Sequence, residues 1–231
     1  MTVRFNRYAI YFAPEDGSTL DRLGTRYLGW DTSSGKFVDH ATVPCLPVPI
    51  SEITKTPRKY GIHGTLKPPF IPLAGVTIDQ IEDTLTNALS DFSAFPLPPI
   101  QLSKLGTFLA LTLSESSAPL AVLAAICVQS LDQFRTRPSA DELARRRSGG
   151  LTPAEDANLQ LWGYPYVMNE FRFHITLTGQ LHDDHIDQAK RALRAYFEPV
   201  LFAQHHMRDV CIFGEDEAGQ FHLLRRLPLN P

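Results

Sequence analysis

Two short stretches of the sequence place a histidine and a threonine two positions apart in a pattern typical of a strand. The stretch YGIHGTL contains His63 and Thr65, and FRFHITLTG contains His174 and Thr176. In the second stretch the odd positions are apolar and the even positions are polar. Strand side chains alternate between two faces, so one face belongs to the core and the other carries a row of hydrogen-bonding groups. That row consists of Arg172, His174, Thr176 and Thr178.

Two imidazoles that face one cleft can share the acid and base work of a reaction near neutral pH. Histidine titrates in that range, and its surroundings can separate the two pKa values. One neutral ring takes a proton from an attacking water or hydroxyl, while the protonated partner donates to a leaving oxygen. A threonine on the same face can donate its hydroxyl to a non-bridging phosphoryl oxygen. These groups suit cleavage of a phosphodiester, especially a cyclic one, without a metal ion, but the motifs do not indicate which histidine is the acid.

Other histidines compete for the same interpretation. His40 and Thr42 in DHATVP repeat the spacing, and about one chance match is expected in a chain of this composition. His40 lies in a proline-rich stretch and opens no repeated unit, so we predict no catalytic role for it. His182 and His185 in HDDH have a spacing that a helical turn could convert into metal ligands. They begin a predicted helix beside two acids, where exposure is usual, and we predict no metal site.

The two motifs open units with the same predicted order of elements. Each unit reads as strand, helix, strand and strand, and the two histidines are 111 positions apart. The first unit comprises 60–66, 77–92, 97–104 and 107–114, and the second comprises 171–179, 183–198, 207–213 and 220–227. A strand at 7–14 and a helix capped by Ser18 precede them. The repeat predicts an α+β fold with two lobes related by a pseudo-twofold, whose antiparallel-rich sheets flank a central cleft.

A distinct segment separates the two units. It carries two predicted capping boxes, Ser139 with Glu142 and Thr152 with Glu155. A pair of glycines lies between them, so we expect two short helices joined by a flexible corner at about 138–163. Such an insert could cap the cleft of a single bilobal domain spanning 1–231.

Charged and aromatic residues near the motifs are candidates for binding a phosphorylated substrate. Lys67 continues the strand face of the first motif, and Arg172 precedes the second histidine on its face. Tyr11 lies on the face of the first strand opposite its apolar neighbours and could reach the cleft. Arg145 and Arg146 belong to a run of three arginines that cannot all point one way on a helix. One or two of them could close on a distal phosphate.

Composition restricts the partners. The 231 residues carry a net charge of −3, with a pI near 6.2, and no apolar run approaches the roughly 18 to 20 residues of a membrane span. We therefore expect a cytoplasmic protein with a small phosphorylated substrate, no membrane contact and no bound long nucleic acid. Three widely spaced cysteines argue against a disulfide framework. The sequence leaves the oligomeric state open.

The paired HxTL motifs resemble those of the two-histidine (2H) phosphoesterase superfamily, also called the LigT-like or cyclic-phosphodiesterase fold. RYAIYFAP, YGIHGTLKPPF, ELARRRSGGLTPAEDANLQLWGYPYV and EFRFHITLTG together resemble the DUF1045 subfamily of phosphonate metabolism proteins, linked to carbon–phosphorus lyase pathways. The resemblance covers nearly the whole chain. It implies that His63 and His174 are catalytic, that Thr65 and Thr176 hold the phosphate, and that no cofactor is needed.

The resemblance also implies a substrate class, with alternatives. The candidate is a ribose-type 1,2-cyclic phosphate that bears a second phosphate. One alternative is an RNA-end 2′,3′-cyclic phosphodiesterase or a 2′,5′ RNA ligase-like enzyme. The other is a nucleotide-binding module that keeps the cleft and turns nothing over.

Overall fold

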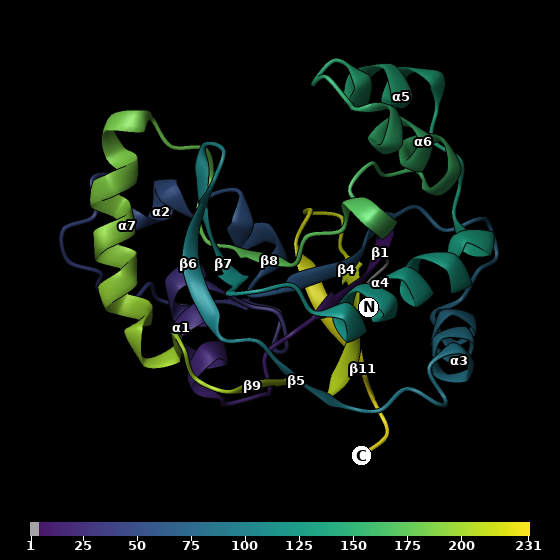
Figure 1. The fold of residues 1–231 in the computed structure, drawn as a ribbon, viewed down its shortest axis with the longest axis horizontal. Coiled ribbons are helices and arrows are strands. Elements are labelled where there is room, and N and C mark those ends of the chain that lie inside the picture. The colour runs from purple at the N-terminus through teal and green to yellow at the C-terminus, as the bar shows by residue number, and fades with distance from the viewer. Residues whose placement is uncertain (1–4) are drawn as a thin grey trace.

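Two antiparallel sheets form the framework of the computed structural model, which describes residues 5–231 (Figure 1). The larger sheet has the order β11-β10-β1-β4, and the smaller has the order β6-β7-β8. The larger comprises β1 (Arg7–Phe12), β4 (Gly64–Phe70), β10 (Asp209–Glu215) and β11 (Phe221–Pro228). The smaller comprises β6 (Ile100–Leu105), β7 (Phe108–Leu113) and β8 (His174–Thr176). Two short ladders pair β2 (Trp30–Asp31) with β3 (Lys36–Phe37), and β5 (Phe95–Leu97) with β9 (His205–Met207). The predicted α+β class with antiparallel sheets is confirmed; residues 1–4 of the predicted domain lie outside the described residues.

The two repeated units exchange their hairpins. The β10–β11 hairpin follows the second motif in sequence, yet it joins the sheet that contains the first motif on β4. Conversely, the β6–β7 hairpin follows the first motif and pairs with β8, which carries the second. Each sheet therefore combines a motif strand from one unit with a hairpin from the other.

Helices cover the outer sides of this framework. They are α1 (Thr19–Leu28), α2 (Ile50–Ile53), α3 (Ile78–Ala88), α4 (Ala118–Ser130), α5 (Ala140–Arg147), α6 (Pro153–Trp162) and α7 (Asp183–Phe197). Helix α7 packs on β6 and β7, whereas α4 packs on β4 and against α3 (Figure 1). One apolar core contains residues from both sheets and from the helices that cover them. In the part of the chain described here, no helix combines the length and apolar character needed to cross a bilayer.

Local capping follows the sequence at most helix starts. The Ser18 hydroxyl accepts from the Asp21 amide, and Thr77 and Thr152 each take part in a reciprocal capping box. The predicted box at Ser139 is only half formed. Its hydroxyl accepts from the Glu142 amide, but the Glu142 carboxylate pairs with an arginine one turn later instead of the Ser139 amide.

Helix α4 and the two motif strands differ most clearly from the predicted elements. Helix α4 was absent from the predicted order because its sequence is apolar on nearly all sides and shows no stripe. The first motif strand was predicted at 60–66 but begins at Gly64, after a 3₁₀ turn at Pro57–Tyr60. The second was predicted at 171–179 but pairs only over His174–Thr176.

The segment between the units forms two helices, as predicted. Helices α5 and α6 project at the upper right of Figure 1, apart from the helices that flank the sheets. Helix α5 buries none of its side chains, whereas α6 buries Leu159. The Arg147 guanidinium pairs with Asp156 and links the two helices. The insert is therefore anchored mainly through α6.

Candidate functional site

The two motif strands meet at one large cavity of about 1190 Å³. His63, Thr65, His174 and Thr176 all line it, so the structure brings the four predicted motif residues together. The strands touch at Gly64, where an added Cβ would lie 2.3 Å from the Phe173 ring. Gly64, the first residue of β4, stands between His63 and Thr65, and Phe173 directly precedes His174. The missing side chain at Gly64 thus allows the two motifs to approach.

Both histidine rings are fixed in the same way. His63 Nδ1 lies 2.9 Å from the Gly61 carbonyl oxygen, and His174 Nδ1 lies 2.8 Å from the Arg172 carbonyl oxygen. A carbonyl oxygen can only accept, so Nδ1 carries the proton in each ring. Nε2 is left as the exchanging nitrogen on both histidines. A nitrogen in this position can take up or release a proton in acid or base catalysis.

The surroundings of the two histidines differ. His63 is 9% exposed, and burial lowers its pKa to about 4, although its bond to the Gly61 carbonyl opposes the change. The nearby His174 lowers the pKa of His63 further. His174 is only half-buried. A neutral His63 is therefore strongly favoured near pH 7.

The polar row of the second motif is divided between the cavity and the interior. Arg172, His174 and Thr176 line the cavity, whereas Thr178 is 1% exposed and does not. The Thr178 hydroxyl accepts from the Leu109 amide and donates to the Gly179 carbonyl. Thr178 thus anchors the chain to β7 where β8 ends.

The prediction that Lys67 faces the cavity is wrong. Tyr11 pairs with Thr65 and Ile10 pairs with Lys67, so one step along β1 matches two steps along β4. This bulge at Leu66 breaks the alternation and turns Lys67 to the core face of the sheet. Lys67 is 2% exposed, its Nζ donates to the Val128 carbonyl, and burial lowers its pKa to about 8.

The remaining predicted binding residues also divide. Tyr11, Arg172 and Arg146 line the cavity. The Arg146 guanidinium lies 5.1 Å from the centre of the Tyr164 ring and pairs with Glu142. Arg145 is exposed and does not line the cavity, because successive helical residues point in different directions. Of the two arginines predicted to close on a distal phosphate, the structure brings only Arg146 to the site.

Further cavity residues were not predicted from the sequence. Arg7 lines the cavity and forms two hydrogen bonds with the carboxylate of Glu215. The aromatic ring of Tyr60 also forms part of the cavity wall. Tyr60 precedes the first motif on a 3₁₀ turn, and strand alternation therefore could not place it. Arg7 shares the cavity side of β1 with Tyr11, and this alternation was the one available signal.

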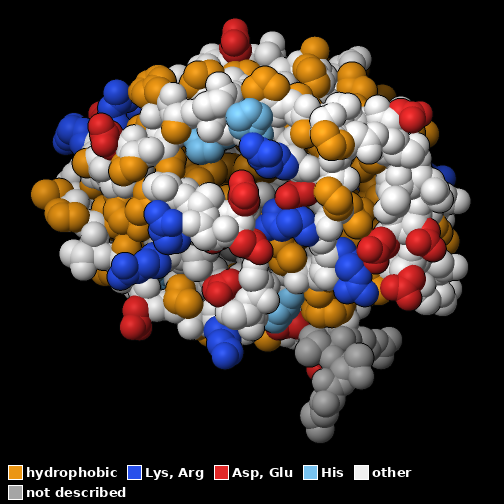
Figure 2. All heavy atoms as spheres, turned by 90° about the horizontal axis from the view of Figure 1, so that it is seen from below, with side chains coloured by type: hydrophobic (Ala, Val, Ile, Leu, Met, Phe, Trp, Pro, Cys, Tyr) orange, Lys and Arg blue, Asp and Glu red, His pale blue; other side chains and the backbone are white. Residues whose placement is uncertain are grey.

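The charges that line the cavity balance. Its formally charged residues are Arg7, Arg146, Arg172, Glu115, Glu155 and Glu170. Three cations face three anions, so the wall lacks the strong positive field that a long polyanion requires. The face shown in Figure 2 likewise intersperses basic and acidic side chains. A ligand with few phosphates fits this balance better than an extended nucleic acid.

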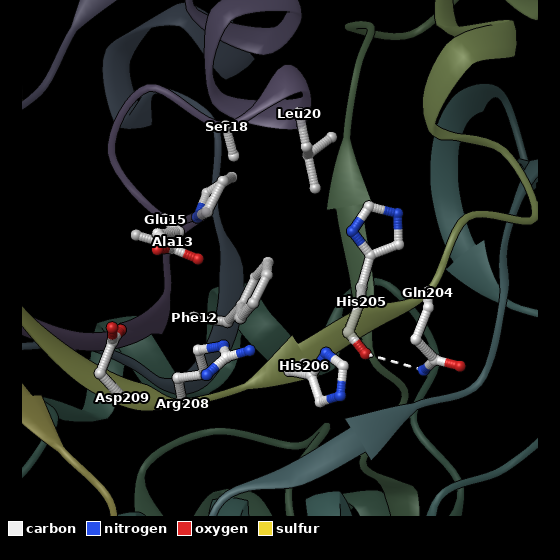
Figure 3. Close-up of a pocket in the computed structure, with 11 residues that line it drawn as sticks. Phe12, Ala13, Glu15, Ser18, Leu20, Gln204, His205, His206, Arg208 and Asp209 are labelled. Atoms are coloured by element: carbon white, nitrogen blue, oxygen red, sulfur yellow. Dashed lines mark hydrogen bonds between the residues drawn. The ribbon is translucent and has the colours of Figure 1, made fainter.

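A second cavity lies away from the motifs. It has a volume of about 220 Å³, and its wall includes Ser18 at the start of α1 and His205 and His206 on β9 (Figure 3). His205 Nε2 lies 3.0 Å from the Val200 carbonyl oxygen, so this ring serves a backbone group. No motif residue lines this cavity. The chemistry predicted from the motifs therefore belongs to the larger cavity.

The histidines set aside on sequence grounds lie elsewhere. His40 Nδ1 bonds to the Tyr27 carbonyl and does not line the cavity. His182 lies beside Asp184, and both side chains are largely exposed. Over residues 5–231, no three His, Cys, Asp or Glu side chains are grouped so that they could hold a metal ion.

Comparisons with known proteins identify the family. The chain is 35% identical over 230 residues to ribose 1,5-bisphosphate phosphokinase PhnN of Janthinobacterium sp. (strain Marseille), covering 97% of this chain and 51% of that protein. It is 30% identical to the protein of that name from Laribacter hongkongensis (strain HLHK9), covering 96% and 51%. The chain thus spans about half the length of these curated relatives. E. coli LigT in complex with 3′-AMP is similar over 99% of this chain and 100% of that one, with 11% identity and a TM-score of 0.48. The family model described as a protein of unknown function (DUF1045) matches residues 65–222, and the chain belongs to this family, as its motifs predicted.

Proposed function

We propose that this protein is a phosphoesterase that hydrolyses a small cyclic phosphodiester by acid–base catalysis with His63 and His174. The supporting observation is the arrangement of the two histidines. They come from different sheets, line one cavity, and both use Nδ1 to bond a carbonyl two residues earlier. Each has a threonine two positions later on the same wall.

The reaction follows from these groups. One neutral histidine takes a proton from water through Nε2 as the water oxygen bonds to phosphorus. The other histidine, protonated on Nε2, gives its proton to the oxygen that leaves phosphorus. One water is added, a phosphomonoester and a hydroxyl result, and the histidines regain their starting states by exchanging protons with solvent. The hydroxyls of Thr65 and Thr176 donate to non-bridging oxygens, where negative charge grows.

The candidate substrate is ribose 1,2-cyclic phosphate 5-phosphate. Hydrolysis of its bond between phosphorus and O2 yields ribose 1,5-bisphosphate, the compound in the name of the two curated relatives. The guanidinium of Arg172 or Arg146 would hold the second phosphate. The kinase activity in those names has no evident counterpart here, because the sequence lacks the G-x-x-x-x-G-K-[ST] loop that commonly cradles nucleotide phosphates.

A nucleoside 2′,3′-cyclic phosphate is the second candidate. The volume of about 1190 Å³ and the tyrosines of the wall favour a ligand with a planar base. Such a ligand would also serve an RNA-end enzyme or a nucleotide-binding module. The balanced charge of the wall favours a short ligand in either case.

Turnover of a substrate panel in EDTA tests the proposal. The panel contains ribose 1,2-cyclic phosphate 5-phosphate, nucleoside 2′,3′-cyclic phosphates and a short RNA with a cyclic end. We expect hydrolysis of one cyclic phosphate, with preference for the ribose compound. Tight binding of one member without any turnover would overturn the proposal in favour of a binding module.

A further inference from the structure

His63 has two tyrosine rings as close neighbours, whereas the aromatic neighbour of His174 lies farther away. The centre of its ring is 4.1 Å from that of Tyr11 on β1 and 5.6 Å from that of Tyr60 on the preceding 3₁₀ turn. The interplanar angles are 37° and 31°, so both tyrosine rings lie tilted against the imidazole. For His174 the aromatic neighbour is Phe108, with ring centres 6.1 Å apart.

A second layer of rings supports the two tyrosines. Tyr60 stacks on Phe221 with ring centres 4.8 Å apart and planes 24° apart, and Tyr11 lies 5.0 Å from Phe213. Tyr11, Phe213 and Phe221 are fully or almost fully buried in one cluster on the cavity side of the larger sheet. The rings that contact His63 are therefore held from behind by β10 and β11.

From this packing we infer that Tyr11 and Tyr60 are positioning residues that hold His63 as the base, which leaves His174 as the acid. The inference rests on the proposed function for its catalytic meaning. The two tyrosine rings cover part of the imidazole and reduce its contact with water, while the bond from Nδ1 to the Gly61 carbonyl stops the ring from turning. The sequence motifs alone could not distinguish the two histidines.

Two opposing effects of the tyrosines can be compared. An aromatic face attracts a cation, which would favour imidazolium. Burial disfavours imidazolium and lowers the pKa of His63 to about 4. The tyrosines are therefore a hydrophobic enclosure for His63 more than a cation site.

The charged and titratable groups around His63 also favour its neutral form. His174 faces His63 from β8, and its positive form disfavours a second positive charge. Tyr11 and Tyr60 face it from β1 and the 3₁₀ turn, and burial raises the pKa of Tyr11 well above its usual value. Arg7, the cation next along β1 on the cavity side, is paired with Glu215. No carboxylate hydrogen-bonds to His63 among the residues that the structure describes, so nothing on these elements offsets its burial.

The roles fix the direction of proton transfer. His63 Nε2 takes the proton of the water that attacks phosphorus, and its ring becomes cationic only as the phosphorus–oxygen bond forms. His174 Nε2 loses its proton to the leaving oxygen as that bond breaks. The charge thus passes from the half-buried ring to the enclosed ring in the transition state. The productive substrate pose places the leaving oxygen near His174 and the attacking water near His63.

Titration of the histidine ring signals by NMR, without substrate, tests the enclosure directly. The variants are Tyr11→Ala and Tyr60→Ala, with Tyr11→Phe and Tyr60→Phe as matched controls that keep the rings. We expect each alanine variant to move the His63 midpoint upward by about one pH unit or more, and each phenylalanine variant to leave it in place. Tyr60 is only half-buried, so its alanine variant remains informative even where Tyr11→Ala does not fold.

The pH profile of kcat/KM provides the catalytic readout. Because the base must be unprotonated, its acidic limb should move upward with the His63 midpoint in the alanine variants. An unmoved His63 midpoint in a folded Tyr60→Ala variant would overturn the inference, whatever the activity. A moved midpoint with an unmoved acidic limb would overturn the assignment of His63 as base. The proposed function is decided separately, by whether any panel member is hydrolysed by the wild-type protein.

Discussion

Replacing His63 should change how the stability of the protein depends on pH. In the folded state burial lowers the pKa of His63 from 6.5 to about 4. Between these values the unfolded chain holds a proton that the folded protein does not. Stability therefore falls as the pH falls through this window. The contribution of neutral His63 is complete above about pH 6.5.

The size of this effect follows from the two pKa values. Each pKa unit corresponds to about 1.4 kcal/mol, so the titration of His63 changes the free energy of unfolding by about 3 kcal/mol between pH 7 and pH 4. His63→Asn removes the titrating group and keeps a side chain of similar polarity. When the pH falls from 7 to 4, the free energy of unfolding of His63→Asn should therefore decrease by about 3 kcal/mol less than that of the wild type.

Urea unfolding at a series of pH values between 7 and 4 measures the difference. The carboxylates contribute to both proteins alike and cancel in the comparison. Thr65→Val is the matched control, since it alters the same cavity wall and leaves His63 in place. Parallel pH dependences for wild type and His63→Asn would refute the claim that His63 is buried in its neutral form.

Three further sets of substitutions test the geometry of the site. Gly64→Ala places a Cβ against the Phe173 ring, which should lower the free energy of unfolding by about 1 to 3 kcal/mol and also lower kcat. The double variant Gly64→Ala with Phe173→Leu should recover part of the stability and part of the rate. Thermal melting and rate assays measure the two effects. A full rate in the single variant would show that the strand approach is unimportant. Thr176→Val should lower kcat/KM by about 10- to 10³-fold with little loss of stability, while Thr178→Val should lose about 1 to 3 kcal/mol of stability because it leaves the Leu109 amide without its acceptor. Equal effects on rate would contradict their different placement. Lys67→Met should leave kcat/KM within about twofold in the same assay, because its ammonium lies outside the cavity, and a tenfold loss would restore a role in binding.

The sequence predicted which side chains of the second motif share one wall, and where two helices begin, because strand alternation and capping are local. Alternation placed His174 and Thr176 on one wall and Ile175 in the core. The capping residues Ser18 and Thr77 mark helix starts that the structure shares. These signals need only a few neighbouring residues.

The errors come from features that depend on distant parts of the chain. The bulge at Leu66 is set by pairing of β4 with β1, and it turns Lys67 to the other face. Exchange of hairpins between the sheets brings Phe213 and Phe221 behind Tyr11 and Tyr60 from the far end of the sequence. Alternation within one strand contains neither kind of information.

The central claim is that His63 and His174 together hydrolyse a phosphodiester. The most direct measurement is kcat in EDTA, on the panel member that turns over fastest, for wild type, His63→Asn, His174→Asn and the control His40→Asn. His40 has the same spacing to a threonine but does not line the cavity. We predict that each motif substitution lowers kcat by on the order of 10²- to 10⁴-fold and that His40→Asn leaves it within about twofold. Wild-type rates in either folded motif variant would contradict the account.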